Sequence, residues 1–320
     1  MSPTVALLRV DHYEAQLLNE RLATLLAPWG GMPAFVKPGQ KVLLKPNLLT
    51  GSRPGKECVT RPELVAAIAR QVRQAGGEPF LGDSPAFGSA KGVAIASGYG
   101  SMLEELAIPV VEFRGVRQST DSPAFQHLRL SREALGADVV INIPKLKSHV
   151  QLTLSAGVKN LFGCVPGKMK AWWHLEAGKD RDRFGEMLVE TARAIAPALT
   201  ILDAIIAHEG NGPSNGEPRS LQLLGASTNV FALDQAIASL LGIDWRSVPT
   251  LTAAERLQLR YETLHYPLLD VQDCCITDWR LPDRLVPIDF GAPRVLRSTL
   301  KHLYIRLIKE RFQNYARSSP

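Results

Sequence analysis

The chain has no uninterrupted apolar run of the roughly 18 residues that a membrane-spanning helix needs. Its first residues, MSPTVALLRVDHYE, also lack the basic segment, apolar stretch and small-residue cleavage site of a secretory signal. The 45% hydrophobic and 21% charged residues are typical of a globular protein that buries a sizeable core. We therefore expect a cytoplasmic protein.

Cysteine is scarce, and its spacing excludes the common cysteine frameworks. The four cysteines form no CxxC pair and no zinc-finger spacing, and a disulfide between the adjacent Cys274 and Cys275 would be strained. Cys164 lies in an apolar stretch, which is typical of a structural thiol. The identity of any metal is left open.

A strongly basic body is also absent, although the net charge of the chain is +6. Residues 291–320 contain seven lysines and arginines against one glutamate, so they carry the whole excess and residues 1–290 are about neutral. This distribution argues against a nucleic-acid partner. We predict an α/β domain over residues 1–290, with a division into two lobes left open, and a basic helical tail over residues 291–320.

The tail has apolar residues at helical spacing, including Leu300, Leu303 and Leu307, with most of its basic residues on the other face. Packing of this amphipathic helix on its own domain is the preferred interpretation. Contact with a membrane surface or a partner protein is the alternative.

What the first 230 residues do contain is an alternation of short β-branched runs and helix-like segments, which is typical of a mainly parallel sheet with helices on both faces. Thr60 is the expected cap of the second helix, ahead of Pro62 and Glu63. We expect strands at 4–10, 41–45, 78–82, 108–113, 138–143, 199–204 and 220–226, and helices at 12–27, 62–75, 181–195 and 230–241.

Polar residues follow four of these strands. Ligands of open α/β sheets bind beyond the carboxyl ends of the strands, so we expect these residues to share one cleft. The alternative is that they are ordinary polar loop residues. The candidates are Lys45 and Asn47, then Asp83 and Ser84, then Lys145, Lys147 and His149, and finally Asp203, Glu209 and Asn211.

The stretch SHVQLTLSAGVKNLFGCVPGK, residues 148–168, adds small residues and a further lysine, Lys159. It is not a nucleotide-binding P-loop, because three residues rather than four separate its glycines and Met169 replaces the magnesium-binding hydroxyl. A serine hydrolase is disfavoured because Ser84 lacks the GxSxG turn and precedes a proline. The lysines instead indicate a pocket for a small anionic ligand, with Lys168 and Lys170 interpreted as solvated loop charges.

Five motifs, KVLLKPNLL, GDSPAFG, INIPKLKSH, GVKNLFGCVPGK and EGNGPSNG, occur in the order found in the bacterial and archaeal domain-of-unknown-function family numbered 362, which the chain resembles from residue 4 to about 245. Many members of that family carry a ferredoxin-like segment that binds four-iron four-sulfur clusters. No cysteine follows Cys275 here, so no cluster of the ferredoxin type is expected.

The chain is also remotely similar to the lactate racemase family, in which a lysine holds a nickel-pincer nucleotide and histidines serve in metal ligation and proton transfer. The matching residues are Lys159 in AGVK, His149 and His174 on either side of it, and the sequence Thr60-Arg61-Pro62. Gly82-Asp83-Ser84 replaces a histidine-containing turn of the racemases, which removes one base of a two-base racemisation.

Two hypotheses follow. In the first, the protein is a racemase-like enzyme that transfers a proton or hydride on a small hydroxy or carboxy compound. His149 and His174 flank the ligand, and His149 serves as the acid/base. Lys159 anchors the ligand, and Lys45 and Arg61 clamp a carboxylate. Alternatively, Lys159 forms a structural ion pair with Asp83 or Asp203. In the second hypothesis, the protein is a non-enzymatic accessory of iron–sulfur or electron-transfer systems that docks on a separate electron-transfer protein.

Overall fold

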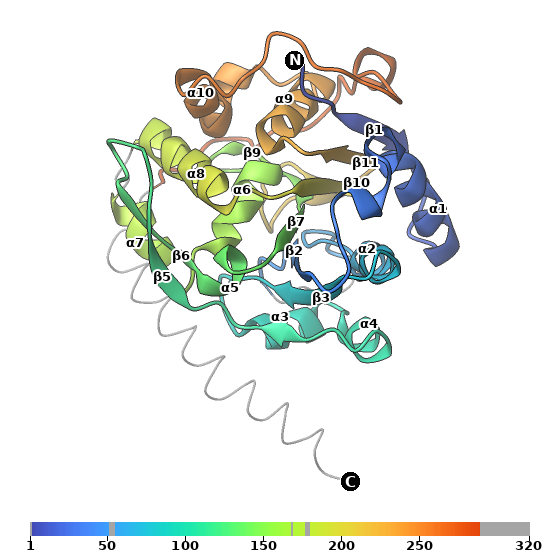
Figure 1. Cartoon of the computed structure of the whole chain (residues 1–320). Coiled ribbons are helices and arrows are strands. Elements are labelled where there is room, and N and C mark those ends of the chain that lie inside the picture. The colour runs from blue at the N-terminus through green and yellow to red at the C-terminus, as the bar shows by residue number, and fades with distance from the viewer. Residues whose placement is uncertain (1, 51–54, 168, 177–179, 289–320) are drawn as a thin grey trace.

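The protein is described here by a computed structural model that covers residues 2–50, 55–167, 169–176 and 180–288, and Figure 1 shows the arrangement of its elements. Within these residues a nine-stranded sheet lies at the centre and a two-stranded hairpin stands apart from it. The hairpin consists of β5 (Gly115–Ser119) and β6 (His127–Ser131). The sheet consists of β1 (Ala6–Arg9), β2 (Lys41–Pro46), β3 (Glu78–Gly82), β4 (Val110–Val111), β7 (Val139–Ile143), β8 (Lys145–His149), β9 (Thr153–Ser155), β10 (Leu199–Glu209) and β11 (Glu217–Ser227).

The sheet is largely parallel. Its strand order is β1-β11-β10-β7-β2-β3-β4, with β8 paired to β10 and β9 paired to β8. Strands β10, β7, β2, β3 and β4 run parallel, and β11 and β1 form an antiparallel edge. Every residue of β7, VVINI, is buried, as expected for a strand covered on both faces. The predicted α/β class with a mainly parallel sheet is confirmed.

Helices cover both faces of this sheet (Figure 1). On one face, α1 (Ala15–Leu26) and α2 (Pro62–Gln74) pack with Val42 and Leu44 of β2. On the other, α8 (Arg181–Ile195) packs in the cluster that contains Leu43. The remaining α-helices are α3 (Ala90–Ala96), α4 (Gly100–Glu105), α5 (Arg132–Leu135), α6 (Gly157–Leu161), α7 (Met169–Glu176), α9 (Val230–Leu240) and α10 (Pro249–Arg256), and the 3-10 turns are η1 (Ala27–Trp29), η2 (Met32–Ala34), η3 (Phe162–Cys164), η4 (Trp245–Ser247) and η5 (Gln272–Cys274).

Two local predictions are wrong. Helix α2 has Arg61 rather than Thr60 as its N-cap, because the hydroxyl of Thr60 instead accepts from Asn47 N at 2.8 Å and donates to Ile143 O at 2.7 Å. Residues 145–149, expected as a loop, form strand β8 beside β10. The predicted basic helix over residues 291–320 lies outside the described residues, and the division into lobes stays a prediction.

Helix α6 carries the central part of the lysine-containing stretch, and a carboxylate from α9 fixes its start. Asp234 accepts hydrogen bonds from Gly157 N at 2.7 Å and from Val158 N at 3.0 Å. A Cβ atom on Gly157 would lie 2.6 Å from Val230 Cγ2, so only glycine allows this approach. Burial raises the pKa of Asp234 to about 7, although the two amide donors oppose the shift.

Asp234→Ala should lower the free energy of unfolding by about 2 kcal/mol or more, because two buried amides lose their acceptor and each unsatisfied group costs roughly 1–3 kcal/mol. Urea unfolding measures the change. Asp11→Ala removes an exposed carboxylate and serves as the control, with an expected change within about 0.5 kcal/mol. Equal losses in the two variants would contradict the capping role.

Candidate functional site

The carboxyl ends of β2 and β3 are joined by a buried ion pair. Lys45 Nζ lies 3.0 Å from Asp83 Oδ1, and both side chains are almost completely buried. Asp83 Oδ2 also accepts from Leu48 N at 2.9 Å, while Lys45 Nζ donates to Asn160 Oδ1 at 3.2 Å. Every polar group of the pair is therefore engaged by the protein, as a buried pair requires.

Asn160 of α6 connects this pair to the neighbouring strands. Its Nδ2 donates to Lys45 O at 3.2 Å and to Asn142 Oδ1 at 2.8 Å, and its Oδ1 accepts from Asn47 Nδ2 at 3.0 Å. Asn142 in turn donates to Gly157 O at 3.0 Å. Sequence reasoning missed Asn142 and Asn160, although both stand inside quoted motifs and a polar residue in an apolar run signals a buried partner.

A second ion pair lies one strand further along the sheet. Lys145 Nζ is 3.1 Å from Asp203 Oδ2 and 3.0 Å from the hydroxyl of Tyr13, which donates to Asp203 Oδ1 at 2.6 Å. Glu57 Oε2 lies 3.6 Å from the same lysine. Sequence reasoning also missed Tyr13 as a member of the site. Its local sequence, HYE, gives no sign of a hydrogen bond to a residue 190 positions away.

Arg61 is held by carboxylates of its own segment. Its guanidinium lies 2.9 Å from Glu57 and 3.1 Å from Glu63, and it stacks over Tyr13 with 4.8 Å to the ring centroid. The backbone amide of Arg61 donates to Asp203 Oδ2 at 3.0 Å. Arg61 therefore belongs to the network around Lys145.

Lys147 has only neutral partners. Its Nζ donates to Asn47 Oδ1 and to Cys58 O, both at 2.9 Å, and in the described part of the chain no carboxylate reaches ion-pairing distance. Burial, together with the positive charges of Lys145 and Lys45, lowers the pKa of Lys147 to about 7.

Lys159 is the least compensated of these lysines. Among residues 2–50, 55–167, 169–176 and 180–288, its Nζ meets ring faces only, at 4.2 Å from the centroid of Phe162 and 5.8 Å from that of Phe184. Burial, followed by the charges of Lys170 and Lys147, lowers its pKa to about 7. The structural ion pair considered for Lys159 is wrong, because Asp83 is taken by Lys45 and Asp203 by Lys145.

Lys170 was expected to be solvated, and that expectation is wrong. It is half-buried, and its Nζ donates to Ser84 O. Burial lowers its pKa to about 8. The hydroxyl of Ser84 accepts from Gly167 N at 3.1 Å, so Ser84 fixes the turn around the lysine. Lys168 lies outside the described residues.

The two candidate histidines are buried and have different hydrogen-bond roles. His149 Nδ1 lies 3.1 Å from Gln151 N, which donates to it, so the neutral ring carries its proton on Nε2. Burial, with Lys159, Lys147 and His174 adding to the effect, lowers the pKa of His149 well below its usual range. His174 Nδ1 lies 3.1 Å from Ile288 O, which only accepts, so its neutral ring has the lone pair on Nε2.

Glu209 and Asn211, also candidates, are engaged by the segment near residue 280. Arg280 Nε lies 2.7 Å from Glu209 Oε1, and Asn211 Nδ2 donates to Asp283 Oδ2 at 2.7 Å. The structure therefore places these two residues in the packing of that segment and not against the lysines.

His208 is a residue that sequence reasoning did not select. It is buried, stands opposite Lys147 in the β8–β10 pairing, and its Nδ1 has no hydrogen-bond partner in the described residues. Burial, then Lys147 and Lys145, lower its pKa to about 4. Its place directly before the candidate Glu209, in the polar stretch that follows the strand predicted at 199–204, was the available signal.

Within the described ranges, no group of three His, Cys, Asp or Glu side chains is arranged to hold a metal ion. None of the helices in that part of the chain is both long and apolar enough to span a bilayer.

The fold and the site define an α/β protein with a buried, lysine-rich polar network at the carboxyl ends of parallel strands. The chain belongs to the family described as Domain of unknown function (DUF362), whose model matches residues 42–239, more than half of the chain. The resemblance inferred from the five motifs is confirmed.

Proteins similar to this chain include a thylakoid-associated protein and a lactate racemase. A thylakoid-associated protein of Synechocystis sp. is 63% identical over 317 residues, which are 98% of this chain and 99% of the relative. The lactate racemase apoprotein from Thermoanaerobacterium thermosaccharolyticum matches 71% of this chain with a TM-score of 0.43 and 13% identity, and the match spans 54% of the racemase.

Lys159→Met and Lys45→Met should affect stability in opposite ways. Lys45→Met leaves Asp83 buried without its ion-pair partner and should reduce the free energy of unfolding by about 3–5 kcal/mol. The pKa of Lys159 is lower in the folded state, so its charge opposes folding at pH 6 and this effect disappears as the pH rises past the unfolded-state value. Lys159→Met should therefore be at least as stable as the wild type at pH 6, with the difference fading by pH 10.

Urea unfolding of both variants at pH 6 and pH 10 measures these changes. A large loss of stability in Lys159→Met at pH 6 would show that its ammonium group has a stabilising protein partner.

Proposed function

We propose that the protein binds a small carboxylate- or phosphate-bearing compound at the carboxyl ends of its parallel strands, with Lys147 and Lys159 as the anchors. The charge balance carries this proposal. Lys45 and Lys145 each face a protein carboxylate, whereas Lys147 and Lys159 face none in the described residues. Since a buried cation without a counter-ion is unfavourable, a bound anion would stabilise both lysines.

Lys45 and Arg61 were expected to clamp the carboxylate of the ligand, but both already bind carboxylates of the protein. We therefore assign this role to Lys147 and Lys159. Asn47 helps to hold Lys147 in place, and Asn160 holds both Asn47 and Lys45. These neutral amides position the cations and leave their charge available to a ligand.

The reaction that we propose is proton transfer on a small hydroxy or carboxy compound. Neutral His149 can donate a hydrogen bond from Nε2 to a developing oxyanion, and the neutral ring of His174 has its lone pair at Nε2, where it would take up the transferred proton. The two rings are near enough for their charges to interact, and Lys159 lies near His149. One donor, one acceptor and an anion anchor are the parts that such a transfer needs. The AGVK motif and its flanking histidines, which resemble the racemases, support the same reaction class.

Inorganic phosphate and L-lactate serve as probes, with binding followed by isothermal titration calorimetry. Lys159→Met should weaken binding of whichever probe binds by roughly 2 kcal/mol, about 30-fold, since it removes a desolvated charge-assisted hydrogen bond. Lys91→Met removes an exposed lysine and should leave the affinity unchanged. Equal affinities of Lys159→Met and Lys91→Met, or no binding of either probe to the wild type, would refute the proposal.

The affinity should also depend on pH. Lys147 and Lys159 in the free protein have pKa values of about 7, so an anion finds both charged below that pH. Between pH 7 and pH 9 each must take up a proton on binding, and the affinity should fall by up to about tenfold per pH unit per lysine. A flat profile across this range would show that neither lysine contacts the probe.

A second candidate role concerns membranes. The relative's description as thylakoid-associated favours the alternative in which the basic amphipathic tail, residues 291–320, contacts a membrane surface. A cytoplasmic location and a separate electron-transfer partner stay predictions.

The full chain should co-sediment with vesicles of phosphatidylglycerol and phosphatidylcholine, and deletion of residues 294–320 should abolish this binding without destabilising the rest. High salt should weaken it, because exposed charges are screened. If the deletion instead lowers solubility or stability and the full chain does not bind the vesicles, the tail packs on its own domain.

A further inference from the structure

A cavity of about 650 Å³ lies at the end of the sheet opposite the lysine network. Lys41 and Glu78 begin β2 and β3, and Pro109 precedes β4, so the cavity lies at the amino ends of these parallel strands. Lys41 and Lys45 stand four residues apart on β2, which corresponds to about 13 Å. This cavity is therefore separate from the candidate site described above.

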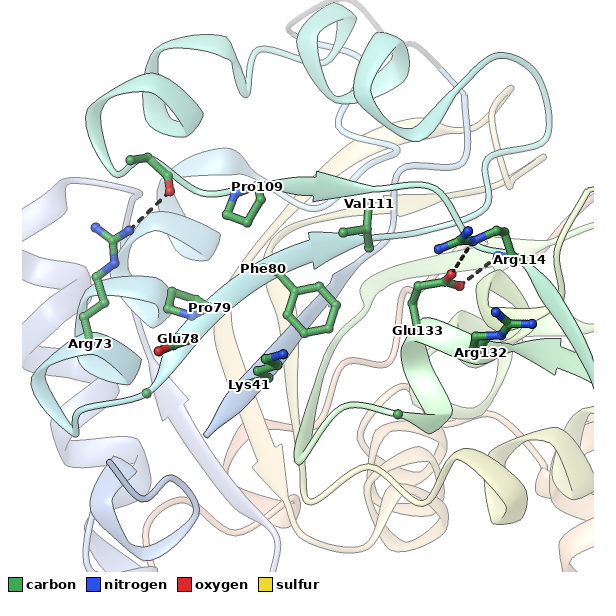
Figure 2. Close-up of a pocket in the computed structure, with 13 residues that line it drawn as sticks. Lys41, Arg73, Glu78, Pro79, Phe80, Pro109, Val111, Arg114, Arg132 and Glu133 are labelled. Carbon is green, nitrogen blue, oxygen red and sulfur yellow. Dashed lines mark hydrogen bonds and ion pairs between the residues drawn. The ribbon is translucent and has the colours of Figure 1, made fainter. Parts of the chain in front are cut away.

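The wall of the cavity presents apolar groups around one aromatic ring. Figure 2 shows the ring of Phe80 in the middle of the lining residues, below Val111, and the lining also includes Pro79 and Pro109. Phe80 and Val111 are only partly buried, so one side of each remains open to a ligand. A flat apolar ring could pack against this wall in the offset or edge-on geometry that aromatic groups prefer.

The charges around Phe80 are mostly positive, and two of them are available. Arg114 is neutralised by Glu133 at 3.0 Å, and Arg73 donates to the carbonyl groups of Leu106 and Ala107. The side chains of Lys41 and Arg132 have no hydrogen bond or ion pair with any residue that the structure describes. They lie on either side of the Phe80 ring in Figure 2.

We propose that this cavity is a second ligand site, for an organic anion that has a flat apolar ring and a phosphate or carboxylate group. The ring would pack on Phe80 and Val111, and the anionic group would bind Arg132, whose planar guanidinium matches two oxygens at once, with Lys41 as a second cation. The volume lies within the range of pockets that hold small organic ligands. Glu78 lines the side nearest Arg73, away from Arg132 (Figure 2), so it does not oppose the anion there.

The probe is 1-naphthyl phosphate, titrated into the full-length chain by fluorescence. Arg132→Gln should weaken binding by about tenfold or more, as expected for the loss of a hydrogen bond to a charged group. The matched control is Arg117→Gln, which removes an exposed arginine of β5 that does not line the cavity, and its affinity should equal that of the wild type. Lys41→Gln should weaken binding by a smaller factor. It serves as a second test of the site in case Arg132→Gln does not fold.

Two further comparisons separate this site from the lysine network and from simple hydrophobic binding. Lys159→Met should leave the affinity for 1-naphthyl phosphate unchanged, and 1-naphthol, which lacks the phosphate, should bind with an affinity that does not respond to Arg132→Gln. The proposal is overturned if the wild type does not bind the probe at millimolar concentration, if Arg132→Gln and Arg117→Gln bind it equally, or if Lys159→Met alone abolishes binding.

Discussion

The buried ion pair between Lys45 and Asp83 determines how the polar network is assembled. A Cβ atom on Gly163 would lie 2.0 Å from Asp83 Oδ1 and 2.4 Å from Lys45 Nζ, so the turn after α6 can close over the pair only with glycine. Asn160 binds the same lysine from within α6. Two strands and a helix thus meet at one pair of charges, and the position of Lys159, one residue before Asn160, follows from it.

The network keeps some cations compensated and others uncompensated. Lys45 and Lys145 are stabilised by carboxylates that have no other cation as near, whereas Lys147 is held by an amide and a carbonyl. Hydrogen bonds to neutral oxygens fix an ammonium group in position but offset little of its desolvation. Stability alone would favour a carboxylate or an apolar side chain at such a position, and the proposal of an anionic ligand rests on this surplus of positive charge.

The sequence predicts those features that depend on local pattern. Strand β7 was found because it is covered on both faces and reads as an apolar run, and α8 was found because a helix-like pattern lies within one continuous segment. Strand β8 was missed because KLKSH reads as a polar loop, although all five residues are buried. Their partners come from distant segments, so the pairing of Lys145 with Tyr13 and Asp203 is invisible to local reasoning. The same limit explains why the motifs located the lysines but could not assign Asp83 to Lys45.

The lysines that lack carboxylates also have lowered pKa values, of about 7 for Lys147 and Lys159 and about 8 for Lys170. Binding of the proposed anion would therefore be coupled to proton uptake. The pKa values of Lys147, Lys159 and Lys170 are all lowered chiefly by desolvation. Lys145 and Lys45 add to the shift of Lys147, Lys170 and Lys147 add to that of Lys159, and Lys45 adds to that of Lys170. An anion placed among them would favour the charged form of every one, so the proposed ligand would bind together with protons and dissociate as they leave. Burial, followed by the charges of Lys159 and Lys147, lowers the pKa of His149, so its ring stays neutral and its Nε2–H remains a hydrogen-bond donor across the range in which the lysines change state.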